Sequence, residues 1–296
     1  MRTLTTFTLA ALFLISCSDI NDKSDAYGNF EAVETIISSE VNGKILSFST
    51  YEGQKLKAGD TVGLIDTVQL YLKKQQTYAQ KKTISTKIQN VLAQIAVQKE
   101  QKKKLLFEKD RIERLLKDGA ATQKQLDDLN SQIELTDKQI SAIEIQNSTT
   151  LNEMEIYTQQ IAQIQDQLDR STIINPLTGT VLETYIEPHE MAMAGKALYK
   201  IANMDELKLR VYISGAQLSD VKIGQEVEVL IDSGEETFSK LKGKISWVSD
   251  QAEFTPKIIQ TKKERVNLVY AMLVLVKNDG TLKIGMPGEI NFKMSE

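Results

Sequence analysis

The sequence contains very few of the side chains on which enzymes rely. It has one histidine, His189, and one cysteine, Cys17, in 296 residues. One imidazole and one thiol cannot assemble a Ser/His/Asp or Cys/His set or a metal-ligand cluster. No glycine loop of the phosphate-binding kind is present either, and a single cysteine excludes an intramolecular disulfide. The sequence therefore predicts a protein that is not an enzyme and has no cofactor and no bound metal.

Two further absences narrow the possible partners. The formal net charge is −4, so the chain lacks the excess of Lys and Arg with which proteins neutralise nucleic-acid phosphates. Beyond the first 17 residues no apolar run approaches the ~20 residues of a membrane-spanning helix. Apolar residues make up 41% and charged residues 26%, as in ordinary folded proteins. We expect no nucleic-acid partner and no transmembrane segment in the rest of the chain.

The first 17 residues have the pattern of a lipoprotein signal peptide. Arg2 provides a short positive region, and residues 7–15 form an apolar stretch too short to cross a bilayer. The following Leu-Ile-Ser-Cys, which ends at Cys17, resembles a bacterial lipobox, whose cysteine is lipidated and becomes the mature N-terminus. An ordinary secretory signal or a buried thiol is the alternative. Residues 18–28 are polar and predict a flexible tether, so lipid at Cys17 is the expected membrane anchor.

Residues 67–170 contain no proline and a single glycine, Gly119. Steps of three and four residues pick out two apolar seams, as in a coiled coil. The first seam comprises residues 84, 88, 91, 95, 98, 102, 105, 109, 112 and 116; the second comprises residues 126, 129, 133, 136, 140, 143, 147, 150, 154, 157, 161, 164 and 168. Asp118-Gly119 is a helix stop and Thr122 a suitable N-cap. The pattern predicts an α-helical hairpin with arms of roughly 75 Å, at 1.5 Å per residue. Such a rod pairs with neighbours or partners, unless it is a spacer.

The segments that flank the hairpin repeat each other. Residues 43–65 align without gaps on residues 179–201, at an offset of 136. The identical pairs are Gly43/Gly179, Leu46/Leu182, Ala58/Ala194, Gly59/Gly195 and Ile65/Ile201. Glycines at these intervals are typical of tight turns between short strands. We therefore interpret residues 29–66 and 171–203 as two halves of one flattened β domain, into which the hairpin is inserted.

Residues 204–296 read as antiparallel β structure. Strand patterns occur at residues 207–213, 226–231, 242–248, 267–276 and 289–292, with a helical turn at 216–221. Several short strands separated by turn signals are typical of a closed or nearly closed barrel. The predicted fold class is α+β: a long coiled-coil hairpin in a split β domain, followed by an antiparallel β-barrel.

This order of parts resembles the HlyD/AcrA-type membrane fusion proteins, the periplasmic adaptors of bacterial tripartite export systems. The resemblance covers nearly all of the expected mature chain, and it identifies the split domain as lipoyl/biotinyl-like. Residues 254–269 (FTPKIIQTKKERVNLV) and 282–288 (LKIGMPG) are most similar to the YbhG-like subgroup, which works with ABC-type exporters. In true lipoyl domains a modified lysine lies between the halves, where this chain has its hairpin, so no lipoyl cofactor is expected.

The resemblance also implies a contact site at the hairpin tip. Adaptors of this kind carry an Arg, a Leu four residues later and a Ser seven residues after that, which engage the outer-membrane channel. Arg111, Leu115 and Thr122 stand at these spacings, with Thr in place of Ser. An arginine fork can bond carbonyls and carboxylates of a partner helix. The alternative is that Arg111 is merely a solvated charge.

The function implied is that of an adaptor in the periplasm, lipid-anchored at the inner membrane. It would bridge an inner-membrane transporter, of the ABC type, to a TolC-like outer-membrane channel, and it would form a homo-oligomer, with six copies by family precedent. Two alternatives remain: an adaptor of a proton-driven pump, or a coiled-coil lipoprotein that only spaces the envelope.

One further group of side chains was considered as a metal site. His189, Met191 and Met193 alternate along a predicted strand, which would place them on one face. Imidazole and thioethers suit Cu(I), but with one histidine in the chain we expect ordinary packing instead. His189 also stands where the first repeat has Gly53 at a turn.

Overall fold

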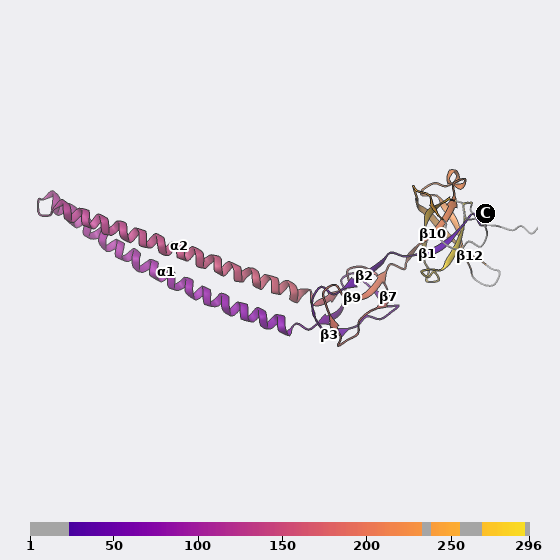
Figure 1. Ribbon diagram of the computed structural model, residues 1–296, viewed down its shortest axis with the longest axis horizontal. Coiled ribbons are helices and arrows are strands. Elements are labelled where there is room, and N and C mark those ends of the chain that lie inside the picture. Colours follow the sequence, from indigo (N-terminus) through magenta and orange to yellow (C-terminus); the bar gives the residue numbers. More distant parts are fainter. Residues whose placement is uncertain (1–23, 233–237, 255–267, 294–296) are drawn as a thin grey trace, which may run out of the picture. The chain divides into compact units, whose positions relative to one another are not determined.

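A computed structural model describes residues 24–232, 238–254 and 268–293 (Figure 1). The predicted signal peptide, Cys17 and most of the segment 254–269 lie outside these residues. Contacts divide the chain into two compact units. One comprises residues 1–35, 178–182 and 201–296; the other comprises residues 36–177 and 183–200.

Two long helices form the hairpin, as the sequence predicts. Helix α1 spans Val68–Lys117 and helix α2 spans Gln123–Asp169, and they run side by side (Figure 1). Every residue of the two predicted seams is buried or half-buried. Ile88, Val91 and Ile95 on α1 and Ile140 and Ile161 on α2 are below 9% exposed. The coiled-coil seam is therefore confirmed, because burial follows the 3.5-residue period along both helices.

Polar seam positions do not all act in the same way. The hydroxyls of Thr136 and Thr150 each donate to the carbonyl four residues earlier in their own helix, at 2.9 Å. They are satisfied locally and make no bond across the seam. Lys102 does cross it, because its Nζ lies 2.6 Å from Asp137 Oδ1. Of these polar seam residues, Lys102 therefore makes a contact between the helices, whereas the two threonine hydroxyls bond only within their own helix.

The turn between the helices is closed by two capping motifs. Gly119 has φ +73°, and its N–H donates to the Leu116 carbonyl at 3.1 Å. The Ala120 N–H donates to the Leu115 carbonyl at 2.8 Å, which completes a Schellman motif. Thr122 is the N-cap of α2 in a capping box with Gln125. The predicted helix stop and N-cap are both confirmed.

The internal repeat is present in the strands at the predicted offset. Strands β3 (Gly43–Phe48), β4 (Lys55–Leu56) and β5 (Thr61–Ile65) are followed 136 residues later by β7 (Gly179–Thr184), β8 (Met191–Ala192) and β9 (Ala197–Ala202). Together with β2 (Glu34–Ser38) and β6 (Thr172–Ile174) they form two four-stranded sheets, in the orders β2-β9-β7-β4 and β6-β5-β3-β8. Both sheets combine strands from before and after the hairpin.

A buried polar contact joins the two segments. Asn175 is fully buried, and its Nδ2 donates to the Lys57 and Leu177 carbonyls at 2.8 and 2.6 Å. Its Oδ1 accepts from the Tyr199 hydroxyl at 3.0 Å. Burial raises the pKa of Tyr199 to about 12, so the hydroxyl keeps its proton and remains a donor at physiological pH. Tyr199 also packs against Phe48 of the first segment, with ring centroids 6.1 Å apart.

The glycines expected at turns fall into two kinds. Gly59, Gly119 and Gly195 have positive φ values of +93°, +73° and +86°, as turns require. Gly43 and Gly179 do not: they are the first residues of β3 and β7, so their assignment as turns is wrong. A Cβ on Gly43 would lie 2.5 Å from Ile65 Cγ2, and one on Gly179 would lie 2.5 Å from the Ala202 carbonyl oxygen. At these two positions glycine permits the close approach of a neighbouring strand.

His189 occupies a position that favours glycine. Its φ is +76°, close to the +82° of Gly53 at the equivalent place in the first repeat. Among the described residues it is the one non-glycine with positive φ. Its N–H donates to the Ile45 carbonyl at 2.8 Å, which holds the turn in this conformation. The sequence comparison of His189 with Gly53 thus identified a conserved backbone turn within the repeat.

The barrel is a closed antiparallel sheet. Its strands are β1 (Ala26–Glu31), β10 (Glu206–Ser214), β11 (Glu226–Asp232), β12 (Phe238–Val248), β13 (Glu253–Phe254), β14 (Leu268–Lys277) and β15 (Pro287–Asn291). They follow the order β10-β1-β15-β11-β12-β14-β13, and pairing of β10 with β14 closes it. A 3₁₀ turn, η1 (Gln217–Asp220), lies where the helical turn was expected. The predicted barrel is confirmed.

One boundary is corrected. The sequence places residues 18–28 in a tether and residues 29–66 in the split domain, but β1 belongs to the barrel. It pairs with β10 and β15, and Phe30 is fully buried in the barrel core with Leu209 and Ile290. Arg210 Nε lies 3.0 Å from Glu31 Oε1 across the same pair of strands. The barrel therefore consists of the C-terminal third plus a strand from the beginning of the chain.

The close approach at Gly179 predicts the effect of a small substitution. Gly179→Ala places a methyl group against a backbone carbonyl that cannot rotate away, so we expect a loss of about 1–3 kcal/mol in the free energy of unfolding. Urea denaturation of the purified protein measures this loss. Gly215→Ala is the matched control, because its Cβ would meet nothing closer than Tyr270 at 3.8 Å. Equal stability of the two variants would contradict the close-approach interpretation.

Candidate functional site at the hairpin tip and base

All three predicted contact residues lie near the tip of the hairpin. Arg111 and Leu115 lie one turn apart near the end of α1, so they share a face of the helix, and Thr122 begins α2. The Arg111 side chain is 59% exposed, and its Nη2 lies 3.3 Å from Glu108 Oε1. An exposed pair of this kind is worth roughly 0–1 kcal/mol, so a partner carboxylate or carbonyl can compete for the guanidinium.

Thr122 is less free than Arg111. Its Oγ1 accepts from the Gln125 N–H at 3.4 Å and donates to Gln125 Oε1 at 3.1 Å, while its own N–H donates to the same Oε1 at 2.8 Å. The hydroxyl hydrogen is therefore already used inside the turn. What Thr122 can offer a partner is its methyl group and one remaining lone pair. The contact with a channel stays a prediction, and its chemistry rests mainly on Arg111 and Leu115.

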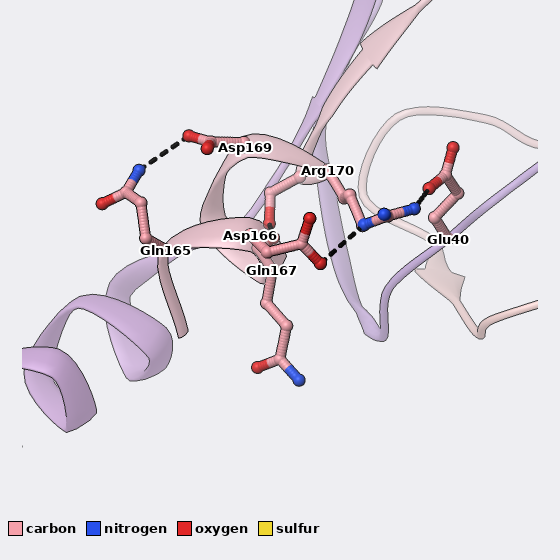
Figure 2. A network of polar contacts seen from close by, with 7 residues as sticks. Glu40, Gln165, Asp166, Gln167, Asp169 and Arg170 are labelled. Atoms are coloured by element: carbon pink, nitrogen blue, oxygen red, sulfur yellow. Dashed lines mark hydrogen bonds and ion pairs between the residues drawn. The ribbon is translucent and has the colours of Figure 1, made fainter. Parts of the chain in front are cut away.

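The base of the hairpin contains a polar cluster that sequence reasoning missed. Arg170 follows α2 directly, and its guanidinium bonds Asp166 on the last turn, with Nε 2.8 Å from Oδ2, and Glu40 in the connection from β2 to β3 (Figure 2). These hydrogen bonds hold the pKa of Arg170 above its usual value. Gln165 Nε2 donates to Asp169 Oδ1 at 2.7 Å beside this cluster (Figure 2). An arginine four residues after an aspartate at a helix end is the signal that could have found it.

A shallow hollow lies against this cluster. It has a volume of about 350 Å³ and is lined by Glu40, Asp166 and Arg170 together with apolar side chains such as Ile37, Ile173 and Leu198. The three charged groups already satisfy one another, so the cluster has a structural role. It ties the end of α2 to the first β segment.

The structure also answers the question of His189, Met191 and Met193. Met191 and Met193 are 61% and 63% exposed, whereas Ala192 between them is fully buried. Strand β8 contains only Met191 and Ala192, so the prediction that all three residues alternate along one strand is wrong, and the exposure of both methionines contradicts the expected ordinary packing. Within the described ranges, no group of three or more His, Cys, Asp or Glu side chains is placed to hold a metal ion.

No helix in the described part of the chain combines the length and apolar character needed to cross a bilayer.

Comparison with known proteins gives the fold and distant relatives. No protein-family model matches the chain. The UPF0194 membrane protein of Yersinia enterocolitica is 26% identical over 298 residues, which cover 90% of this chain and 88% of that protein. The UPF0194 membrane protein of Enterobacter sp. strain 638 is 33% identical, over 44% of this chain and 39% of its own length.

Two solved structures share the architecture. MacA from Actinobacillus actinomycetemcomitans aligns with a TM-score of 0.54 at 20% identity, over 90% of this chain and 76% of its own. The membrane fusion protein Spr0693 from Streptococcus pneumoniae aligns with a TM-score of 0.53 at 17% identity, over 91% of this chain and 98% of its own. The chain therefore has the membrane fusion protein fold.

The capping box predicts how Thr122 tolerates substitution. Thr122→Ala removes the acceptor for the Gln125 N–H and should cost about 1 kcal/mol in local stability, so the first amides of α2 should exchange hydrogen roughly fivefold faster. Thr122→Ser should exchange like the wild type, because the hydroxyl remains. Thr149→Ala, which removes a mid-helix hydroxyl bonded to the Ile145 carbonyl at 3.2 Å, is the control. Unchanged exchange at Gln125 in Thr122→Ala would show that the cap is dispensable.

Proposed function

We propose that the protein is a periplasmic adaptor of a tripartite export system, linking an inner-membrane transporter of the ABC type to a TolC-like outer-membrane channel. The observation that carries the proposal is the architecture: a coiled-coil hairpin inserted in a split β domain and followed by a barrel, as in the solved membrane fusion proteins. The distant relatives named as membrane proteins extend over most of the chain and are consistent with this assignment.

The geometry suits coupling and sealing, and no chemical step is needed. A helix of 50 residues is about 75 Å long, which carries the tip far from the β strands at its base. The tip presents an exposed guanidinium and a half-buried leucine on one face, a combination that can bond and pack against partner helices. The β domains would contact the transporter and neighbouring copies, and a homo-oligomer, six copies by family precedent, would enclose the conduit. Stimulation of the exporter's ATP hydrolysis by the protein distinguishes an ABC partner from a proton-driven pump.

The proposed anchor is a lipid on Cys17, at the periplasmic face of the inner membrane. The described chain begins at Ser24, and the Asp25 N–H already donates to the Ile290 carbonyl of the barrel at 2.9 Å. The seven residue-to-residue steps from Cys17 to Ser24 span at most about 25 Å, because an extended chain advances about 3.3–3.6 Å per residue. A lipid at Cys17 would thus keep the barrel within about 25 Å of the membrane surface.

Loss of the tip guanidinium should uncouple the adaptor from its channel. Arg111→Asp places a carboxylate where a cation is needed, so cross-linking from the tip to the outer-membrane channel and export of the substrate should both fall at least tenfold, with helix content unchanged. Lys138→Asp reverses an exposed charge on α2 away from the tip and should behave like the wild type. Undiminished cross-linking in Arg111→Asp would remove the tip contact. Normal export in a strain that lacks the gene would favour the envelope-spacer alternative.

The anchor has its own test. Mass spectrometry of membrane extracts should find acyl groups on Cys17, and Cys17→Ser should abolish this acylation, because the thiol that would carry the lipid is gone. Membrane-bound protein with an unmodified Cys17 would contradict the proposed anchor.

A further inference from the structure

Lysines of α1 meet carboxylates of α2 along the middle of the hairpin. Helix α1 has thirteen Lys and Arg against four Glu and Asp, whereas α2 has two Lys against nine Glu and Asp. Three ion pairs join the two helices: Lys87–Glu153, Lys99–Glu144 and Lys102–Asp137. In this part of the rod, α2 therefore supplies a negative charge for lysines that α1 places beside the seam.

Two lysines near the base of the hairpin have no such carboxylate. Lys74, Thr77 and Lys81 continue the α1 seam toward its N-terminus, because they precede Ile84 by steps of three and four residues. Lys74 Nζ donates to the side-chain oxygen of Gln165 instead. Among the described residues, the Lys81 ammonium has no hydrogen-bond or ion-pair partner. Both lysines are half-buried, so two positive charges lie in a seam, where uncompensated charge is costly.

A groove lies beside these two ammonium groups. It has a volume of about 360 Å³ and is lined by Lys74, Tyr78 and Lys81 of α1 and by Ile161, Ala162 and Gln165 of α2. None of the residues that line it is acidic. Both helices thus contribute to one hollow, which combines two cations with an aromatic ring and aliphatic side chains.

The polar groups that remain free in the groove are positively charged donors. An ammonium has three N–H groups, and Lys74 uses one of them on Gln165, so two remain, while Lys81 keeps all three. The Gln165 amide is used at both ends, since its Nε2 donates to Asp169 Oδ1 at 2.7 Å (Figure 2). Thr158 Oγ1 donates to a main-chain carbonyl of its own helix at 3.0 Å. A ligand of this groove must therefore be an acceptor, and an anion is the best one.

Tyr78 provides an apolar surface between the two cations. It lies about one turn from each lysine on the same face of α1, and Lys74 Nζ lies 5.8 Å from the centre of its ring. Tyr78 is 46% exposed, so part of its surface is open to a ligand. Ile161 and Ala162 add aliphatic surface from α2. An open aromatic and aliphatic surface beside two cations suits an anion that has an apolar body, rather than a bare inorganic ion.

We propose that this groove binds a small amphipathic organic anion. A sulfonate, carboxylate or phosphate group of the ligand accepts hydrogen bonds from Lys74 and Lys81, while its apolar body covers Tyr78 and the aliphatic side chains of α2. The volume suits a small ligand, since small-molecule sites begin at about 300 Å³. The ligand contacts both helices and neutralises two cations in the seam, so its binding stabilises the base of the hairpin. This site goes beyond the adaptor function, and its test requires neither exporter nor channel.

Calorimetric titration of the purified full chain with naphthalene-2-sulfonate tests the site. Lys81→Met keeps most of the side-chain length but removes the charge, so the affinity should fall by about tenfold or more. Lys81→Arg should stay within about threefold of the wild type, because it keeps a cationic donor. Lys82→Met is the matched control, since Lys82 is the adjacent lysine, is exposed and does not line the groove. Equal affinity of Lys81→Met and Lys82→Met would overturn the proposal.

Three further probes test the chemistry of the ligand. Naphthalene-2-methanol has the ring without the charge, and sodium sulfate has the charge without the ring; each should bind at least tenfold more weakly than naphthalene-2-sulfonate. A hexaglutamate peptide, which stands for an acidic segment of a partner protein, should also bind more weakly. Equal or tighter binding of any of these three probes would overturn the assignment of an amphipathic organic anion.

Hydrogen exchange tests the effect of the ligand on the hairpin. With naphthalene-2-sulfonate at ten times its Kd, the amides of residues 74–81 and 158–165 should exchange up to about tenfold more slowly, because the ligand binds only when both helices are in place. Residues 111–122 at the tip should keep their rates. Ala162→Phe fills the groove without a change of charge and should abolish both the binding and the slower exchange. Binding without slower exchange at the base, or persistent binding in Ala162→Phe, would overturn the proposed site.

Discussion

Asn175 and Tyr199 form the contact on which the arrangement of the split domain depends. The Asn175 side chain bonds the Lys57 carbonyl in the segment before the hairpin and the Tyr199 hydroxyl in the segment after it. These groups are buried, so the loss of one partner would leave the other without a hydrogen bond inside the domain, at about 1–3 kcal/mol per unsatisfied group. The same region pairs β5 with β6, matching Leu64 with Thr172. Because α1 follows β5 and α2 precedes β6, this pairing brings the start of α1 beside the end of α2.

Different surfaces of the hairpin serve stability and recognition. Its seam provides stability through buried aliphatic side chains, although Asn147 Oδ1 is buried there with no partner in the described part of the chain. Its outer surface has a different composition, with basic residues on one helix and acidic residues on the other. Charge is costly in a seam but inexpensive on an exposed surface, so this outer charge does not weaken the fold. The tip residues occupy a third, distinct place, at the end of the rod.

The repeat shows how one sequence pattern can serve two physical purposes. Gly59 and Gly195 are needed for positive φ, whereas Gly43 and Gly179 are needed because a neighbouring strand comes too close for a side chain. Both pairs look alike in the alignment. His189 demonstrates that the turn at Gly53 is retained even where glycine is lost, since a hydrogen bond from its N–H to the Ile45 carbonyl holds the same conformation.

Local periodicity in the sequence determined the hairpin, its seam, the stop at Gly119, the N-cap at Thr122 and the strands of the repeat, because each depends on residues close together in the chain. The tertiary structure alone decided which sheet each short strand joins. Strand β1 pairs with β10, some 180 residues later, and nothing in a six-residue alternating pattern specifies so distant a partner. The exposure of Met191 and Met193 and the Arg170 cluster are of the same kind. They depend on which surfaces meet, and the chain defines those surfaces only once it has folded.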